Sequence, residues 1–562
     1  MAGIMCLIGA KATVAAAEWQ WSVVVDSMVS PETNDHPRAF LWIPPGCQRV
    51  RGVVVGQHNM LEEGILEHSY FRQTLADLGL AEVWITPGLD LVFDFTKGAG
   101  DQFNGMMKSL AKESGYQELE FAPVVPMGHS AAASYPWNFA AWNPARTLAV
   151  LSVHGDAPLT HLTGSGRPNP DWGDRKIDGV PGLMVEGEYE WREDRVAPAL
   201  DYRNAHPAAP VSMLADVGHG HFDFSDQLVR YLALFLRKAV ALRLPEDASL
   251  DKPVKLRPVD PRQGWLIDRW RMGGNPKAQP APYDQYKGDP KDAFWCFDKE
   301  MAMATLNYNN QSGKLPQLLG FVQEGRTLQQ LPKTPEQVRL QFIPLEDGIS
   351  FKLTGTFLDT VPDDNPSKWA GLPAGSRIGH ASGGGPVMIS RICGPVVQTG
   401  PDTFSIRFYR MGMNSVKRSN DIWFVATHPG DDQYKSAVQQ ADLRFPLRNT
   451  EGSEQHIAFP AIPDQRDSVP FLKLNATSDA GMPVYYYVRE GPAEIEGDII
   501  KFTPIPPRSR FPVKVTVVAW QWGRSIEPRL KTAEPVEHTF SILKDADGKI
   551  TPVEIIPKTQ SH

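Results

Sequence analysis

Cysteine is scarce in this chain, whose 562 residues contain only Cys6, Cys47, Cys296 and Cys393. The four lie far apart and form no Cys-x-x-Cys pair, which argues against a zinc module and a disulfide framework. Long basic runs are missing too, since no block of five or more Lys and Arg residues occurs and the formal net charge is −8. We therefore expect no nucleic-acid partner. No stretch of 18 apolar residues occurs, so no membrane span is expected.

The abundant residues indicate a folded protein of several domains. Hydrophobic residues make up 42% and charged residues 22% of the sequence, which excludes wholesale disorder. At roughly 100–200 residues per domain, the length allows three or four domains. Glycine (47) and proline (49) together make 96 residues, about 17% against a usual level of roughly 12%. This excess predicts many turns and much β-structure.

The first 17 residues are typical of the back half of an export signal. Residues 2–10 are nearly all apolar, and Ala15-Ala16-Ala17 before Glu18 offers an Ala-x-Ala cleavage site. The basic start of such a signal is missing, so either the true start lies upstream or the segment is a tail with no address. We expect residues 1–17 to be a signal-peptide remnant and the protein to be secreted or periplasmic in a bacterium.

Residues 18–245 alternate short apolar runs with amphipathic stretches. This alternation predicts an α/β domain with a mainly parallel sheet and helices on both sides. The clearest helix covers 226–240, where Leu228, Leu232 and Phe235 recur at helical spacing. The predicted strands are 40–43, 53–56, 83–85, 124–127, 148–153, 182–185 and 211–214, and the other predicted helices are 65–78, 102–112, 131–142 and 196–204.

Beyond residue 245 the pattern changes and predicts all-β sandwich domains. Residues 246–292 are rich in Pro, Asp and Lys, which is typical of a linker or a wrapping segment. Residues 293–458 hold strand-like runs separated by turns, and we expect a β-rich domain there. In residues 459–545, short β-branched and aromatic runs alternate with Gly and Pro turns, which predicts a small sandwich. Residues 546–562 form a tail.

The segment with the clearest chemistry is Gly128-His129-Ser130-Ala131-Ala132. An apolar run precedes this Gly-x-Ser-x-Ala pattern and a helix-like stretch follows it, as a nucleophile elbow requires. The small residues Gly128 and Ala132 would let strand and helix approach closely. We predict Ser130 as a nucleophile and the Ala131 amide, at the start of the helix, as an oxyanion donor.

A serine nucleophile needs a histidine base, which we expect between the last strand and the last helix. Gly218-His219-Gly220-His221 lies there and offers two candidates. We favour His221 because it is nearer the helix, and keep His219 as the alternative.

The histidine in turn needs an acid at the end of an intervening strand. Glu190, three residues after Gly187, is our first choice, and Asp156, at the end of the preceding strand, is the alternative. The order Ser130, acid, His221 places each residue at the carboxyl end of a predicted parallel strand, which is the edge where open α/β sheets hold their sites.

With these motifs, residues 18–245 resemble the α/β-hydrolase superfamily. The elbow matches, and Gly187-Glu188-Tyr189-Glu190 is similar to the Gly-Glu-x-Asp that follows the seventh strand there, with Glu in place of Asp. The segment 221–226 resembles the histidine region of chlorophyllase-like and platelet-activating-factor-acetylhydrolase-like members. Such relatives take their acid from the preceding strand, which keeps Asp156 open. Residues 459–545 resemble a bacterial immunoglobulin-like module.

The chain departs from the superfamily where a His-Gly pair often follows the third strand, because it reads Gly56-Gln57-His58-Asn59. We expect a backbone amide there, that of Asn59 or its neighbour His58, to be the second oxyanion donor. The alternative is that Asn59 caps a helix starting near Leu61.

Three aromatic residues lie near the expected site. Trp172, Tyr189 and Trp191 would form an apolar platform for a sugar or aryl ring, or would simply anchor their loops. Taken together, the sequence predicts an exported serine hydrolase acting on an ester, with a small molecule or polysaccharide as substrate and no metal or cofactor. The alternatives are a peptidase of the same fold and a non-catalytic carbohydrate-binding or surface protein.

Overall fold

The computed structural model describes residues 18–545, apart from 162, 247–251, 310–312, 333 and 364–366. The predicted signal remnant (1–17) with Cys6, and the tail (546–562), lie outside the described residues. Among the residues described, no helix is long and apolar enough to cross a membrane.

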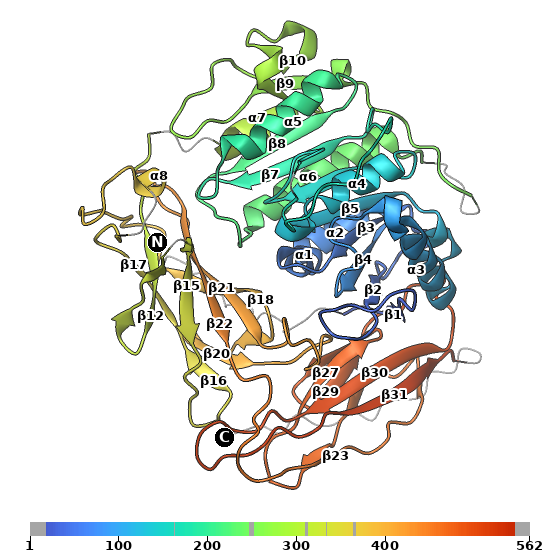
Figure 1. Ribbon diagram of the computed structural model, residues 1–562. Coiled ribbons are helices and arrows are strands. Elements are labelled where there is room, and N and C mark those ends of the chain that lie inside the picture. The colour runs from blue at the N-terminus through green and yellow to red at the C-terminus, as the bar shows by residue number, and fades with distance from the viewer. Residues whose placement is uncertain are drawn as a thin grey trace, which may run out of the picture.

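One eight-stranded sheet organises residues 18–245 (Figure 1). Its strand order is β1-β2-β4-β3-β5-β6-β7-β8, with β1 and β2 antiparallel and every pair from β4 to β8 parallel. This order confirms the predicted α/β-hydrolase fold. The strands are β1 Trp21–Val24, β2 Arg38–Trp42, β3 Gly52–Gln57, β4 Leu80–Thr86, β5 Val124–His129, β6 Val150–Val153, β7 Gly182–Gly187 and β8 Val211–Asp216.

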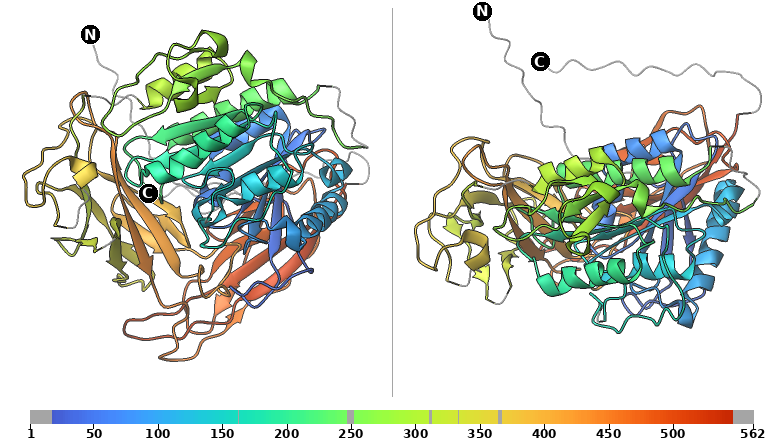
Figure 2. Two further views of the ribbon diagram at one scale, coloured as in Figure 1. Left: turned by 45° about the horizontal axis from the view of Figure 1, so that its top comes forward. Right: turned by 90° about the horizontal axis from the view of Figure 1, so that it is seen from above.

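Helices cover both faces of this sheet. Central strands such as β3 are largely apolar and fully buried, so each face needs a helical layer. Figure 2 shows α2 and α6, which pack together, on one face and α3, α4 and α5 on the other. The predicted helix over 65–78 is two helices, and the His68 side chain caps the second. The bounds are α1 Leu61–Leu66, α2 Ser69–Leu78, α3 Ala99–Ser114, α4 Tyr135–Trp142, α5 Glu193–Ala205 and α6 Asp226–Arg243.

The segment that follows extends the α/β unit. Residues 265–296 carry a small antiparallel sheet, β10-β9-β11, of which β9 and β10 lie in the stretch that the sequence indicated as linker or wrapping and β11 lies just beyond it. Residues 293–309, assigned from the sequence to the β-rich domain, pack on the α/β unit instead. There α7 lies against β8 and α6, and Phe294, Trp295 and Met301 join the core of that unit. The bounds are β9 Trp265–Asp268, β10 Ala281–Pro282, β11 Ala293–Cys296 and α7 Lys299–Asn309.

Residues 319–444 form a second unit built mainly of antiparallel sheets, here called the β unit. Its largest sheet has the order β14-β15-β22-β21-β18, and two three-stranded sheets lie beside it. Phenylalanine side chains fill its core. The elements are β12 Leu319–Gln323, β13 Arg326–Thr327, β14 Gln330–Leu331, β15 Thr334–Gln341, β16 Ser350–Lys352, β17 Thr354–Phe357, α8 Ser367–Ala370, β18 Met388–Cys393, β19 Val396–Gln398, β20 Thr403–Ile406, β21 Asp421–His428 and β22 Ala437–Arg444.

The C-terminal unit contains a four-stranded sheet, β24-β31-β30-β27, and a three-stranded sheet, β25-β29-β28. They share one apolar core that includes Tyr486, Ile500 and Val517. This unit docks on the β1 edge of the large sheet, where Glu490 contacts Ser22 and Arg38. Its strands are β23 Ile457–Ala458, β24 Gln465–Arg466, β25 Phe471–Lys473, β26 Thr477–Ser478, β27 Tyr485–Glu490, β28 Ala493–Glu496, β29 Ile499–Phe502, β30 Val513–Trp520 and β31 Val536–Leu543.

A buried ion pair joins the β unit to the α/β unit. Arg410, with a side chain 2% exposed, places Nη1 2.6 Å from Glu63 Oε1 and 2.7 Å from Glu67 Oε1. Burial and the charge of Glu67 raise the pKa of Glu63 to about 7, and Arg410 and Arg391 oppose that rise. The carboxylate of α1 therefore depends on a cation supplied by the other unit.

Replacing Arg410 with alanine tests this docking. A buried carboxylate without its cation is costly, so we expect R410A to lower the free energy of unfolding by about 3–5 kcal/mol at pH 8. Because the raised pKa of Glu63 lets it take up a proton as the pH falls, the loss should shrink at pH 5.5. Urea denaturation at both pH values measures the free energy of unfolding of R410A and of the wild type. R529A is the matched control, because Arg529 pairs with Glu451 and Glu527 at the surface. An R410A loss below about 0.5 kcal/mol at pH 8, the level of a surface pair, would contradict the prediction.

Candidate active site

Ser130 lies on a sharp turn between β5 and a short helical turn, Ser130–Ala132. Its backbone φ is +51°, a left-handed conformation that non-glycine residues rarely adopt. Gly128 makes the turn possible, because a Cβ atom at that position would lie 2.0 Å from the Ala132 carbonyl oxygen. Strain of this kind between a strand and a helix is the geometry of a nucleophile elbow.

The helix after this turn starts later than predicted. The sequence pattern predicts this helix over 131–142, which would put Pro136 inside it. In the structure α4 begins at Tyr135, so Pro136 lies in its first turn. A proline is tolerated there because the missing N–H would have no partner within the helix.

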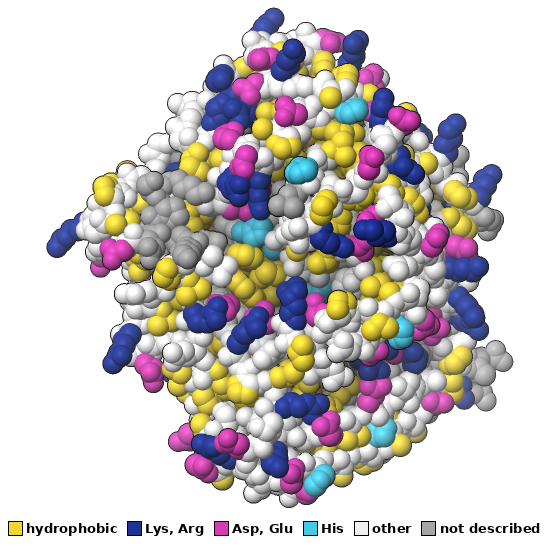
Figure 3. Space-filling model, in the orientation of Figure 1, with side chains coloured by type: hydrophobic (Ala, Val, Ile, Leu, Met, Phe, Trp, Pro, Cys, Tyr) yellow, Lys and Arg dark blue, Asp and Glu magenta, His cyan; other side chains and the backbone are white. Residues whose placement is uncertain are grey.

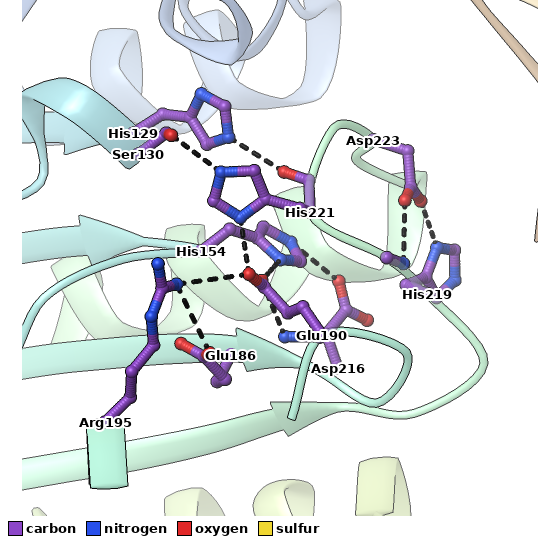
Figure 4. Close-up of polar contacts among 12 residues, drawn as sticks. His129, Ser130, His154, Glu186, Glu190, Arg195, Asp216, His219, His221 and Asp223 are labelled. Atoms are coloured by element: carbon purple, nitrogen blue, oxygen red, sulfur yellow. Dashed lines mark hydrogen bonds and ion pairs between the residues drawn. The ribbon is translucent and has the colours of Figure 1, made fainter. Parts of the chain in front are cut away.

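Three predicted residues meet at the carboxyl edge of the sheet (Figure 4). His221 Nε2 lies 2.6 Å from Ser130 Oγ, and His221 Nδ1 makes a short hydrogen bond to Glu190 Oε2. Ser130 follows β5, His221 follows β8 and Glu190 follows β7. Because the Glu190 carboxylate accepts the hydrogen bond from His221 Nδ1, it holds the imidazole ring with Nε2 facing Ser130.

Glu190 is largely buried, with a side chain 13% exposed, and is fully supplied with donors. Its Oε1 accepts from His154 Nδ1 at 3.0 Å and from the Gly187 amide at 3.2 Å. Its Oε2 faces His221, with Arg195 Nη1 at 3.3 Å. Burial alone would raise the pKa of Glu190, but the charge of His221 and the hydrogen bonds from His154 and His221 outweigh it and hold the pKa well below the usual range.

The alternative histidine and acid make other contacts. His219 Nδ1 makes a short hydrogen bond to Asp223, and in Figure 4 its ring points away from Ser130. Burial would lower the pKa of His219, but the charges of Asp216 and Asp223 raise it to about 9. Asp156 accepts hydrogen bonds from the Ser134 hydroxyl and, at 2.8 Å, from the Gly164 amide. His219 and Asp156 therefore hold loops around the elbow.

The two predicted oxyanion donors are the backbone amides of Ala131 and Asn59. The Ala131 amide stands at the start of the short helical turn beside Ser130. The Asn59 assignment does not fit, because its amide N–H donates to Glu62 Oε2 at 3.1 Å, as the Met60 amide does at 2.9 Å. A glutamate close behind a turn often folds back onto the backbone in this way. Burial raises the pKa of Glu62 to about 7, and the backbone N–H groups that donate to its carboxylate oppose that rise.

The aromatic platform is also a wrong prediction. Trp172 is 2%, Trp191 6% and Tyr189 9% exposed, so none offers a free ring face. Trp172 Nε1 donates to Asn138, Trp191 packs edge-on against Trp270, and Tyr189 stacks on Trp369 of α8. The sequence showed aromatic residues in a loop, but their burial depends on distant partners.

One residue at the elbow, His129, was not predicted as part of the site, and Asn59 takes part through its side chain rather than its backbone amide. His129 Nε2 donates to the His221 carbonyl oxygen at 2.8 Å, and the Asn59 side-chain amide donates to the His129 carbonyl oxygen at 3.0 Å. Burial and the neighbouring His221 push the pKa of His129 well below its usual value, so the ring is neutral. The elbow thus holds the His221 loop from one side.

The β unit holds the same loop from the other side. Gln440 donates to Asp223, and Trp423 packs on Phe222 with ring centroids 4.9 Å apart. Lys435 Nζ lies 2.9 Å from Glu188 Oε1, near the acid. Figure 3 shows histidine and hydrophobic side chains gathered in a hollow where the two units meet. The site therefore lies between the units, which no local sequence pattern indicated.

No group of three or more His, Cys, Asp or Glu side chains in the described part of the chain is arranged to hold a metal ion. Cys47, Cys296 and Cys393 are free and buried. The chemistry available at this edge is that of a hydroxyl, an imidazole and a carboxylate.

No protein-family model and no curated protein matches the sequence. Solved structures that match include dienelactone hydrolase from Anabaena variabilis (17% identity, 40% of this chain and 98% of that chain, TM-score 0.27). Est1E from Butyrivibrio proteoclasticus matches at 12% identity (39% and 99%, TM-score 0.26). A truncated carbohydrate esterase from gut microbiota matches at 10% identity (40% and 99%, TM-score 0.28). Likenesses this weak say nothing about activity, and the fold assignment rests on the strand order given above.

The loop over the elbow gives a test of the site's geometry. A Cβ atom on Gly164 would lie 2.3 Å from the Ser130 carbonyl oxygen, so G164A must displace the elbow or the loop. Because a misplacement of about 1 Å can cost about 100-fold in rate, we expect the rate at which a fluorophosphonate probe labels Ser130 to fall at least about tenfold. Gly105 lies in α3 with nothing within 4 Å of such a Cβ, and G105A should keep the wild-type rate. Equal rates for the two variants would show that the loop does not press on the elbow.

Proposed function

We propose that this protein is a serine hydrolase of carboxylic esters, with Ser130 as nucleophile, His221 as general base and Glu190 as the acid that orients it. One observation carries the proposal. Ser130 has a strained φ of +51°, and its Oγ lies 2.6 Å from His221 Nε2. The other ring nitrogen of His221, Nδ1, is hydrogen-bonded to Glu190 Oε2. This arrangement supports nucleophilic catalysis because a serine hydroxyl needs such a base to attack at neutral pH.

In the first half of the proposed reaction, Ser130 Oγ forms a bond to the ester carbonyl carbon and its proton passes to His221 Nε2. The Ala131 amide stabilises the developing oxyanion. The tetrahedral intermediate then collapses, the bond from carbon to the alcohol oxygen breaks, and His221 returns its proton to the leaving alcohol. Glu190 stays ionised throughout and stabilises the imidazolium.

In the second half, water attacks the acyl-enzyme while His221 takes its proton. The bond from carbon to Ser130 Oγ then breaks, and the serine recovers a proton from His221. The carboxylic acid leaves and the site is restored. Every proton is carried by His221, so the proposed reaction uses no cofactor.

We propose an ester on a carbohydrate as the substrate class. The support from this chain is the aromatic pair Phe222 and Trp423. Phe222 packs against His221 with ring centroids 4.5 Å apart, Trp423 packs on Phe222, and both rings are partly exposed. Aromatic faces beside the base suit the apolar face of a sugar in the leaving group. The proposed export rests on residues 1–17, outside the described residues.

Removing the nucleophile tests the proposal directly. S130A should lose hydrolysis of p-nitrophenyl acetate to near the background rate, a fall in kcat of about 10⁴-fold or more, because the remaining groups only bind and polarise the ester. A fluorophosphonate probe should label the wild type at Ser130 and leave S130A unlabelled.

Two outcomes would contradict this function. Unchanged hydrolysis by S130A, or labelling at another serine, would remove the assigned nucleophile. Faster turnover of amide than of ester substrates by the wild type would indicate a peptidase. A kcat/KM for an acetylated oligosaccharide no higher than that for p-nitrophenyl acetate would remove the carbohydrate part of the proposal.

The two histidines of the loop provide a matched comparison. H221A removes the base, so kcat should fall by about 10⁴-fold or more. H219A removes only a contact to Asp223, which steadies the loop, and should lower kcat by about tenfold at most. Steady-state kinetics on purified variants of equal thermal stability measures both. A larger loss in H219A than in H221A would exchange their roles.

A further inference from the structure

His154 lies between two buried carboxylates beside the proposed triad (Figure 4). Its Nδ1 is 3.0 Å from Glu190 Oε1, and its Nε2 is 3.3 Å from Asp216 Oδ2. The side chain is fully buried. The residue directly follows β6 with φ +44°, a strained conformation that persists only where the surroundings enforce it.

The Glu190 carboxylate is hydrogen-bonded to Nδ1, and the Asp216 carboxylate lies at ion-pair distance from Nε2, so both acids favour a protonated ring. A neutral imidazole carries a lone pair on one nitrogen, which would point at a carboxylate oxygen from one side or the other. Both contacts are attractive only if both nitrogens carry protons. In agreement, burial would lower the pKa of His154, but the neighbouring carboxylates of Asp216 and Glu190 raise it to about 10.

We propose that His154 is a positioning residue of the triad, whose imidazolium holds Glu190 Oε1 so that Oε2 stays aimed at His221 Nδ1. This inference rests on the proposed function and goes beyond it. A glutamate has one more rotatable bond than the aspartate that is commoner at this position, so its carboxylate needs more contacts to fix it. The two oxygens of Glu190 have one histidine each, His154 on one side and His221 on the other.

The support continues behind His154. Asp216 ends β8, and its Oδ1 accepts a 2.6 Å hydrogen bond from the hydroxyl of Tyr308 in α7. An unbroken series of contacts thus runs from α7 through Asp216, His154, Glu190 and His221 to the Ser130 hydroxyl. The segment that packs on the α/β unit after residue 293 therefore contributes to the alignment of the proposed triad.

The charge of His154 also acts on the base. Removing a cation next to the Glu190–His221 pair makes that pair bind a proton more tightly, so the pH at which the base becomes active should rise. The other titratable groups around His154 remain in such a variant. They are Glu190 and Asp216, which contact it, and His129, His219, His221, Glu186 and Arg195, which lie around them.

Two substitutions separate the charge from the hydrogen bond. H154L removes both, whereas H154N keeps a donor near the position of Nδ1 on a residue that tolerates the left-handed backbone. In H154L we expect kcat to fall at least about 30-fold with KM within about threefold, and in H154N a fall of less than about tenfold. In both variants the acidic limb of the kcat/KM profile should move up by about 0.5–1 pH unit.

H456L is the matched control, because His456 also pairs with an aspartate, Asp479, at 2.9 Å but is 79% exposed in the C-terminal unit. It should keep the wild-type kcat and pH profile. An unmoved acidic limb in H154N would show a merely structural role and overturn the inference, whether or not H154L folds. So would a kcat for H154L within threefold of wild type.

The failure of this inference and of the proposed function are distinguishable. If S130A is inactive and the probe labels Ser130, while both His154 variants keep the wild-type profile, only the role of His154 falls. If hydrolysis does not depend on Ser130, the proposed function falls and the role of His154 falls with it.

Discussion

The site depends on keeping one buried carboxylate ionised. Glu190 lies beneath the loops at the edge of the sheet, where an unpaired charge would be strongly disfavoured. Donors from four separate segments satisfy it: His154 after β6, the Gly187 amide in β7, Arg195 in α5 and His221 after β8. If any of these segments moves, the carboxylate loses a donor and tends to take up a proton. It would then no longer stabilise a charged imidazole. The positions of these four segments and the reactivity of Ser130 are therefore linked through Glu190.

The loop that carries His221, all of whose residues the structure describes, contains no helix or strand and is held from both sides. The elbow supplies His129, which donates to the His221 carbonyl oxygen, and the β unit supplies Gln440, which donates to Asp223. The Arg410 ion pair fixes the two units against each other at α1. The β unit is therefore part of the scaffold of the site, and its docking fixes a loop that the α/β unit alone would leave held on one side. A site between two units is also a common place for ligand binding.

The sequence allowed the fold of residues 18–245 and the order of the candidate residues to be predicted, because both follow from local patterns. Strand ends mark where side chains meet in a parallel sheet, and this was enough to favour His221 and Glu190, which the structure brings together with Ser130. The errors concern contacts between distant segments. The Asn59 amide was predicted as an oxyanion donor, but it donates to Glu62 instead. Trp172 was predicted as part of a platform, but its indole is buried and donates to Asn138. His154 gave no local signal beyond its place at the end of a strand, since its role depends on two acids that follow other strands.

The replacement of the commoner aspartate by Glu190 accounts for much of what surrounds it. Glu190 lies three residues beyond the end of β7, so its longer side chain reaches back over the turn to the Gly187 amide. That reach leaves Oε1 free of His221, and the Gly187 amide and His154 Nδ1 both donate to it. A neutral donor would satisfy its hydrogen bonding, but only a cation also opposes the effect of burial on the carboxylate. His154 supplies both at the cost of a strained backbone and a second buried acid, Asp216, which in turn draws a hydrogen bond from Tyr308. The longer acid is thus backed by a histidine, an aspartate and a tyrosine from three other elements.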